Sequence, residues 1–308
     1  MAINTYSRIE PASLQSSVRN FYDRGGFVNG LVPKVAGRIW YVAGLKQDST
    51  TLLIGDNGFS GRSPDKPFAT MARVFEFVTH NDIIVVSGLI REQIAAPVNV
   101  YDVTIVGAAN RPRQATSGGT ATGGGSTWLG PTSPTAATPL LILKQQGWRI
   151  ENIFFGAPSD AAAVQLLRDA GVGTLERDAS HTEFINCRFE GGQDGIQQSG
   201  GCGHVGIYDC FFTAQTGFAI RHTTGAAVAY PIRWQLWDNR FLDCANVLRI
   251  PAVKWDIRRN SVINTTTEVM DLTDGDATSG NNFIVYNYFN IAAADFDPVG
   301  KVRGSSTD

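Results

Sequence analysis

From residue 147 onward, apolar and polar residues alternate in short runs, and each run is interrupted once by a shift of phase. Alternation with period two predicts β-strands. The shift falls at an Asn or Asp in most copies, where the chain is expected to bend between two strands. The pattern therefore predicts pairs of short strands, and its six copies span residues 148–155, 182–189, 205–212, 234–241, 255–262 and 282–289.

The copies recur at unequal intervals. Their last apolar positions are 34, 23, 29, 21 and 27 residues apart. A constant motif with variable spacing is typical of a solenoid whose loops differ in length. Five of the copies are followed by a third apolar strand, at residues 164–166, 196–198, 218–220, 248–250 and 270–272. Three strands per coil predict an all-β protein, a right-handed single-stranded parallel β-helix over residues 80–300.

Stacked coils place equivalent residues above one another at about 4.8 Å. The sequence thus predicts one interior stack of rings, formed by Phe155, Phe189, Phe212 and Phe241. It also places three amides in one column, at Asn239, Asn260 and Asn287. Asn is common in turns, but three in register favour a hydrogen-bonded ladder that satisfies buried turn backbone. Cys187 and Cys210 share that column, and we interpret them as small buried apolar residues.

The ends of the chain differ from this repeat. Residues 67–79 have helical spacing after a Pro, which predicts a short helix that caps the open end of the solenoid. Residues 111–139 predict a long loop with at most one strand. The predicted division is an N-terminal attachment arm (1–36), an entry segment with the capping helix (37–79), the solenoid (80–300) and a C-terminal tail (301–308).

Composition narrows the functional classes. Hydrophobic residues make up 43% of the 308 residues and charged residues 18%, which fits a folded protein with a core. A net charge of -2 gives no electrostatic reason to expect nucleic acid or a membrane surface. No apolar run reaches transmembrane length. The start from Met1 to Asn4 has no basic region followed by an apolar stretch, so we expect no secretory signal. The four cysteines are too few for a disulfide scaffold.

Candidate catalytic groups are sparse. Glu268, Asp271, Asp274 and Asp276 form the densest acidic cluster. Paired carboxylates at about 5–9 Å can hydrolyse glycosides, but acidic residues in Gly-containing turns are usually solvated. The four histidines fall at expected coil corners, where we interpret them as polar turn residues: His80, His181, His204 and His222. We predict no catalytic residue, no metal site and no cofactor.

Several aromatic residues fall at positions that alternation turns outward. Trp and Tyr anchor many protein interfaces, and several on one face of stacked coils make a contiguous patch. The alternative is that long loops of the same chain cover them. The predicted partner interface comprises Phe154, Tyr208, Phe211, Trp237 and Tyr288, with Val285 beside them. The arm has apolar anchors of its own, among them Phe21, Tyr22 and Phe27.

A family resemblance adds to these inferences. The string from Asp56 to Thr70, DNGFSGRSPDKPFAT, resembles the entry segment of right-handed β-helix proteins of the pectate-lyase-like superfold. The preceding string from Gly37 to Val42, GRIWYV, is similar to that of β-helix proteins of tailed bacteriophages. Such phage proteins serve as tailspikes, fibre domains or head-surface proteins and are commonly trimers. The polysaccharide enzymes of this superfold carry strings such as Asn-Thr-Asp, Asp-Asp or Gly-His-Gly, which this sequence lacks.

The resemblance implies a non-enzymatic virion structural protein, in first place a trimeric head-surface (decoration) protein. Its partners would be further copies of the chain and phage capsid or tail proteins. The alternatives are a tailspike or fibre-like receptor-binding protein, or a polysaccharide lyase or hydrolase that acts on host surface glycan. Localisation in the virion follows from the leading interpretation.

Overall fold

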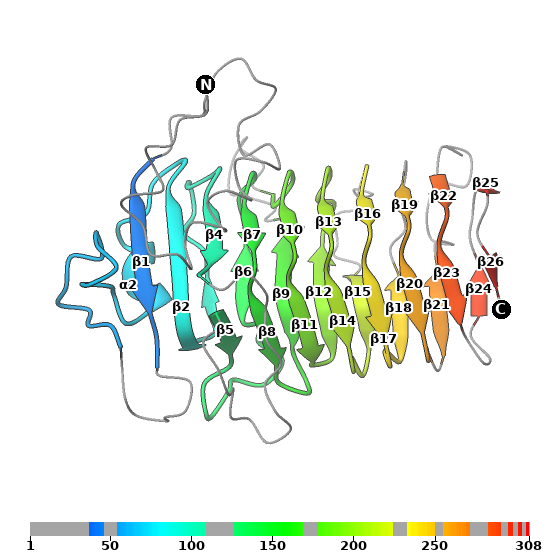
Figure 1. Ribbon diagram of the computed structural model, residues 1–308, viewed down its shortest axis with the longest axis horizontal. Coiled ribbons are helices and arrows are strands. Elements are labelled where there is room, and N and C mark those ends of the chain that lie inside the picture. The colour runs from blue at the N-terminus through cyan, green and yellow to red at the C-terminus, as the bar shows by residue number, and fades with distance from the viewer. Residues whose placement is uncertain are drawn as a thin grey trace, which may run out of the picture.

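The protein is a right-handed parallel β-helix, as a computed structural model shows. The coils lie in one row from the N-terminal to the C-terminal end (Figure 1). The structure describes residues 37–45, 54–108, 126–168, 178–223, 233–249, 255–265, 267–271, 283–290, 295–297, 301–303 and 306–307. The predicted attachment arm, residues 1–36, lies outside the described residues.

Three parallel sheets run along the solenoid, and each coil contributes one strand to each sheet over most of its length. Sheet A consists of β1 (Ile39–Ala43), the first half of β2 (Ile83–Arg91), β4 (Thr104–Gly107), β7 (Arg149–Glu151), β10 (Glu183–Ile185), β13 (Gly206–Tyr208), β16 (Gln235–Trp237), β19 (Asp256–Arg258), β22 (Phe283–Val285) and β25 (Lys301–Arg303).

Sheet B consists of the second half of β2, β5 (Ser126–Leu129), β8 (Phe154–Ala157), β11 (Arg188–Gly191), β14 (Phe211–Thr213), β17 (Arg240–Leu242), β20 (Ser261–Ile263), β23 (Tyr288–Asn290) and β26 (Ser306–Thr307). Sheet C consists of β3 (Ile94–Ala95), β6 (Leu141–Leu143), β9 (Ala162–Leu167), β12 (Asp194–Ser199), β15 (Phe218–Thr223), β18 (Asn246–Arg249), β21 (Glu268–Asp271) and β24 (Asp295–Asp297).

Strand β2 joins sheets A and B without a loop. The bend falls at Gly88, whose φ is +70°. A Cβ there would lie 2.8 Å from the carbonyl oxygen of Leu45, so both the left-handed backbone and the close approach require glycine.

The predicted interior stack of phenylalanines is confirmed. Centroid distances are 5.3 Å from Phe155 to Phe189, 4.7 Å from Phe189 to Phe212 and 5.0 Å from Phe212 to Phe241, with the ring planes within 14° of parallel. Trp128 extends the stack in the N-terminal direction at 5.8 Å. Each ring thereby covers the next, and the column keeps the coils in register.

A short helix closes the N-terminal end of the core. Helix α2 (Met71–Phe75) is shorter than the predicted 67–79. The side chain of Thr70 caps its first turn, and the Glu92 carboxylate accepts the amides of Met71 and Ala72 at 2.9 Å each. Phe75 reaches the core and meets Trp148 edge-on at 6.0 Å between ring centroids.

The strand ladder extends past the predicted solenoid range at both ends. β1, in the predicted entry segment, pairs with β2, and β25 and β26, in the predicted tail, pair with β22 and β23. In the described part of the long loop predicted at 111–139, residues 126–139, there is one strand, β5. Among the described residues, no helix has the length and apolarity of a membrane span.

Candidate interaction face

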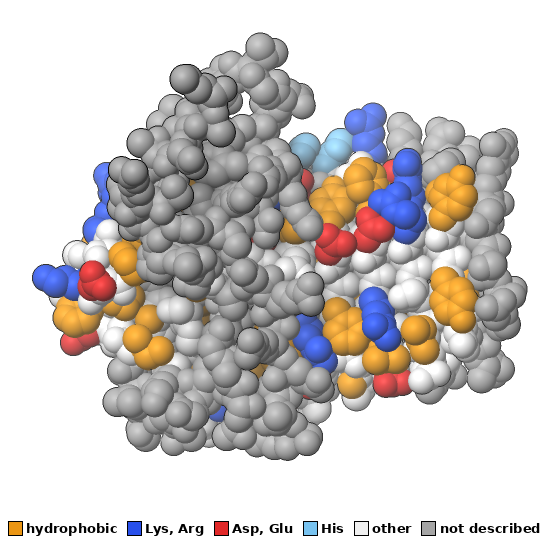
Figure 2. Space-filling model, viewed as in Figure 1, with side chains coloured by type: hydrophobic (Ala, Val, Ile, Leu, Met, Phe, Trp, Pro, Cys, Tyr) orange, Lys and Arg blue, Asp and Glu red, His pale blue; other side chains and the backbone are white. Residues whose placement is uncertain are grey.

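The outward side of sheets A and B carries the aromatic residues that the sequence marks as an interface. The name A–B face is used below for one set of outward side chains. In sheet A they belong to β10, β13, β16 and β19, and in sheet B to β11, β14, β17, β20 and β23. Figure 2 shows hydrophobic and charged side chains side by side over this half of the solenoid. Apolar rings and charges therefore share one surface.

In sheet A, the face is centred on two rings in register. Tyr208 lies beside Trp237 with ring centroids 5.3 Å apart, and the guanidinium of Arg258 lies 5.5 Å from the centre of the Trp237 ring. The Tyr208 ring crosses Gly206, where a Cβ would lie 2.5 Å from it. The hydroxyl of Tyr208 donates to Gln235. Glycine at 206 therefore makes room for the ring to lie along the sheet.

The hydroxyl of Tyr208 stays protonated at neutral pH. Burial, followed by the negative charges of Glu183 and Asp256, raises its pKa to about 12. The group therefore acts as a hydrogen-bond donor and not as a base. The two carboxylates lie on either side of the aromatic pair. This arrangement also suits a sugar, because carboxylates accept hydrogen bonds from its hydroxyls and aromatic rings stack on its apolar face.

In sheet B, arginines alternate with aromatic rings along one column. Arg188 pairs in register with Phe154 on one side and with Phe211 on the other, and Arg240 follows Phe211. The guanidinium carbon of Arg188 lies 5.8 Å from the Phe154 ring centre and 4.7 Å from that of Phe211, and that of Arg240 lies 5.6 Å from Phe211. Such cation–π contacts contribute about 0.5–1 kcal/mol each when exposed.

Most charges on the face have a partner of opposite sign, either on the face or on β7 beside it. Arg188 lies 3.0 Å from Glu190, Arg149 lies 3.4 Å from Glu183, and Arg258 contacts Asp256. Most of these side chains are partly exposed, so the pairs add little to stability. They do leave the face with both signs of charge interspersed.

The predicted interface residues differ in how much of each side chain is exposed. Tyr208, Phe211 and Trp237 are partly buried, and Tyr288 is 37% exposed. Phe154 was expected on the exposed patch, but only 1% of it is accessible, because Arg188 and the neighbouring coils cover its ring. Val285 is likewise buried.

One exposed ring was missed by alternation. Tyr286 occupies the corner between β22 and β23 with φ +57° and is 72% exposed. The same corner position has positive φ in the preceding coils, at Asn152, Asn186, Asp209, Asp238 and Arg259. Asn and Asp tolerate this conformation, whereas Tyr rarely adopts it. The residue type therefore did not indicate a corner, and only the alignment of Tyr286 with the corner residues of the other coils could have done so.

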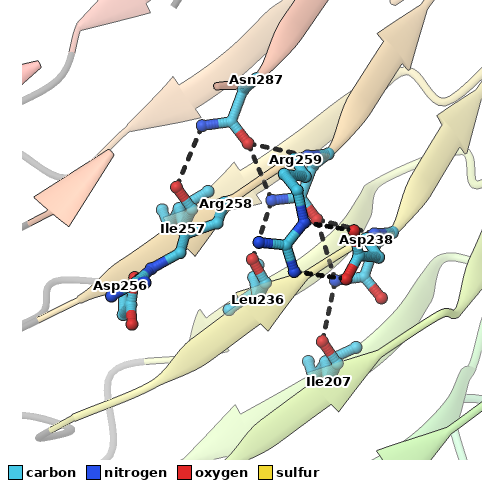
Figure 3. Close-up of polar contacts among 10 residues, drawn as sticks. Ile207, Leu236, Asp238, Asp256, Ile257, Arg258, Arg259 and Asn287 are labelled. Carbon is cyan, nitrogen blue, oxygen red and sulfur yellow. Dashed lines mark hydrogen bonds and ion pairs between the residues drawn. The ribbon is translucent and has the colours of Figure 1, made fainter. Parts of the chain in front are cut away.

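The three asparagines that follow this corner form a continuous network (Figure 3). The Asn239 amide Nδ2 donates to Asn260 Oδ1 at 3.0 Å, and Asn260 Nδ2 donates to Asn287 Oδ1 at 2.9 Å. Each Nδ2 also donates to a strand carbonyl: Ile207 at 2.8 Å, Leu236 at 2.8 Å and Ile257 at 3.0 Å. Outside the ladder, Arg259 binds Asp238 through two contacts of 2.7 Å.

The acidic cluster that the sequence singled out falls only partly within the described residues. Glu268 and Asp271 lie on β21, and Asp274 and Asp276 fall outside the described residues. In the described part of the chain, no group of three or more His, Cys, Asp or Glu residues could hold a metal ion. Burial raises the pKa of Cys202 and of Cys244 to about 12, so these thiols remain protonated and unreactive.

Asp194 is a buried carboxylate that the sequence did not single out. Burial raises its pKa. It accepts the amide of Phe218 at 3.0 Å and pairs with Arg221 at 2.7 Å. These contacts tie two neighbouring coils together, which is a structural role.

Two histidines stack at the corner between sheets C and A. The rings of His181 and His204 lie 4.6 Å apart at an interplanar angle of 10°. Parallel rings direct their nitrogen lone pairs along parallel lines, so the pair is not arranged to chelate one metal ion. His222 lies at the end of β15, where its Nδ1 contacts Gln198, and His80 stacks on Tyr101 at 3.7 Å.

The stacked pair predicts loss of stability in acid. Burial, followed by the charges of His181 and Arg233, lowers the pKa of His204 below the ordinary 6.5. The unfolded chain then binds the proton more readily, so the contribution of His204 is present above about pH 6.5 and is lost as pH falls through the folded pKa. We expect the melting temperature to fall less between about pH 7.5 and 5.5 in His204→Asn than in the wild type. Equal falls in both proteins would contradict this role.

Comparison with known proteins gives likeness at the level of structure alone. No protein-family model and no curated protein sequence matches the chain. The chain resembles pectate lyase Pel9A (TM-score 0.44, 12% identity) over 85% of its own length and 62% of the lyase. It resembles a rhamnogalacturonan lyase (TM-score 0.36, 12% identity) over 88% and 87% of the two chains. It also resembles a GH136 lacto-N-biosidase from Eubacterium ramulus (TM-score 0.25, 9% identity) over 88% and 68%.

Proposed function

We propose that the protein is a non-enzymatic structural component of a tailed-bacteriophage virion that assembles as a homotrimer through the A–B face. A head-surface (decoration) role is the preferred placement. The observation that carries the assembly is the gathering of arginines and aromatic rings on that face. Arg188 and Arg240 flank Phe211 in sheet B, and Tyr208, Trp237 and Arg258 follow one another in sheet A. These residue types are enriched where proteins bind one another.

A second copy of the chain suits this face. Arg188 and Arg258 lie beside Glu190 and Asp256, and Glu183 and Arg240 add one charge of each sign, so two copies can meet without a net excess of one charge. The rings of Tyr208 and Trp237 are held by their neighbours in the sheet, and little conformational entropy is lost when they are covered. The phage origin rests on the resemblance of the entry segment.

The assembly is tested by placing charges at the centre of the face. We expect the variant Tyr208→Glu with Trp237→Glu to sediment as a monomer while its circular dichroism stays that of the wild type. A carboxylate buried without a partner opposes association. Val98→Glu with Ile54→Glu is the matched control, since these side chains are 45% and 51% exposed and lie away from the face. An unchanged sedimentation coefficient in the first variant would remove the A–B face from the assembly.

Attachment to the particle is proposed to use the arm. We expect the full-length variant Phe21→Ser, Tyr22→Ser, Phe27→Ser to be recovered poorly when mixed with particles that lack this protein and pelleted. The apolar anchors would gain order by burial against the particle, and serine cannot supply that burial. Recovery equal to that of the wild type would move the attachment site onto the solenoid.

A glycan-active protein is the second candidate, either a tailspike-like receptor-binding protein or a polysaccharide lyase or hydrolase. It is favoured by Glu183 and Asp256 on either side of Tyr208 and Trp237. Incubation of the protein with host capsule or lipopolysaccharide tests it. New reducing ends or unsaturated products would establish an enzyme, and binding without products would establish a receptor-binding protein.

A further inference from the structure

A second apolar cluster lies outside the core, on the outward face of sheet A in the first coils. Val85 and Val106 point away from the core, because their strand neighbours Ile84 and Ile105 point into it. Even so, Val85 is only 5% exposed and Val106 only 4%. The residues packed against them are Ile39, Tyr41, Ile83 and Ala108.

Shielding of this outward column ends partway along the solenoid. Glu151 and Ile185, the next two residues in register, are 1% and 3% exposed. Tyr208 and Trp237, which follow in β13 and β16, are partly exposed. The shielded stretch therefore runs from β2 to β10 and stops where the A–B face begins to open.

We propose that this outer cluster is the docking site of residues 1–36 of the same chain. The segment ends beside the site: the amide of Gly37 donates to the carbonyl of Asn81 at 2.9 Å, and β1 with Ile39 begins two residues later. A chain of this length reaches about 120 Å when extended. The shielded strands span a few coils at about 4.8 Å each, so length does not limit the segment.

The composition of the segment fits the cluster. Its apolar residues can cover the outward valines, namely Phe21, Tyr22, Phe27, Val28, Leu31 and Val32. It also carries more basic than acidic residues, with Arg8, Arg19, Arg24 and Lys34 against Glu10 and Asp23. Glu151 lies in the outward column itself, and the neighbouring column presents Arg149 and Glu183. The two carboxylates outnumber the one guanidinium, so the charges are complementary. By contrast, residues 109–125 contain no Phe, Tyr, Trp, Leu, Ile or Val.

The docked segment has a consequence for the protein off the particle. The apolar anchors of residues 1–36 would cover the outer apolar cluster, and the same anchors are proposed to bind the particle. Attachment would therefore require them to leave the outer cluster and bind the particle instead. The docking itself needs no particle and does not rest on the proposed virion role.

Photo-crosslinking of the full chain tests the proposal. Benzoylphenylalanine is placed at Phe21, the purified protein is irradiated, and the adducts are mapped by mass spectrometry. We expect adducts within β1, β2 and β4. Mixing chains labelled with ¹⁴N and ¹⁵N distinguishes contacts within one chain from contacts between chains. A probe at Tyr286, 72% exposed on a distant coil, is the control and should give no adduct on these strands.

Two variants keep the test decisive. Val106→Asp should lower the yield of these adducts about tenfold, as expected when a buried carboxylate opposes docking. Because that change touches the solenoid, Phe27→Ser in the segment serves as a second variant that leaves the coils intact, and it should lower the yield in the same direction. Adducts at other sites, adducts only between differently labelled chains, or yields unaffected by both variants would overturn the proposal.

Discussion

Phe212→Ala is expected to lower the free energy of unfolding by about 3–5 kcal/mol, as for other large buried aromatics. Phe212 has no accessible surface and lies between Phe189 and Phe241 at 4.7 and 5.0 Å. Its removal leaves a cavity that the rings above and below cannot fill, because each is fixed by its own coil. Urea unfolding followed by circular dichroism measures the change.

The neighbouring residue supplies the control for that substitution. Phe211 is adjacent in sequence but points outward, so Phe211→Ala should cost less than Phe212→Ala. A difference between the two in the opposite direction would mean that the inward and outward positions of β14 have been assigned wrongly.

Asn260→Ala is expected to cost about 1–3 kcal/mol, since it leaves the buried amide of Asn239 without its partner and removes one of the hydrogen bonds to the carbonyl of Leu236. Asn260 Oδ1 accepts the amide of Asn239 at 2.9 Å, and its Nδ2 donates to the carbonyl of Leu236 at 2.8 Å. Neither backbone group is accessible to water at this corner. Asn290→Ala, which changes an exposed Asn on β23, should shift stability by less than about 0.5 kcal/mol. Equal effects of the two variants would contradict a structural role for the ladder.

The fold could be predicted because stacking imposes the same requirement on every coil. A ring above a ring or an amide above an amide recurs in sequence as a column of one residue type, as at Phe189, Phe212 and Phe241. The unequal spacing between copies did not obscure the repeat, because loops of different length leave the strand register unchanged. Register itself is fixed by the alternation of inward and outward residues.

The surface was less predictable, because exposure depends on what lies over a residue. Phe154 and Phe211 occupy the same outward column, yet Phe154 is only 1% exposed whereas Phe211 remains partly exposed. Arg188 and Arg240, whose guanidinium groups lie over these rings, were visible in the motif directly before the inward Phe. Alternation alone, however, does not predict a cation–π contact. The pairing of β1 with β2 joins residues more than forty positions apart, beyond the reach of a local pattern.

The mass of the purified full-length protein in solution is the most direct test of the proposed assembly. We predict a mass of three times 33.2 kDa by sedimentation equilibrium, falling to 33.2 kDa for Tyr208→Glu with Trp237→Glu. A wild-type protein that remains at 33.2 kDa at every concentration tested would contradict the trimer and, with it, the role of the A–B face.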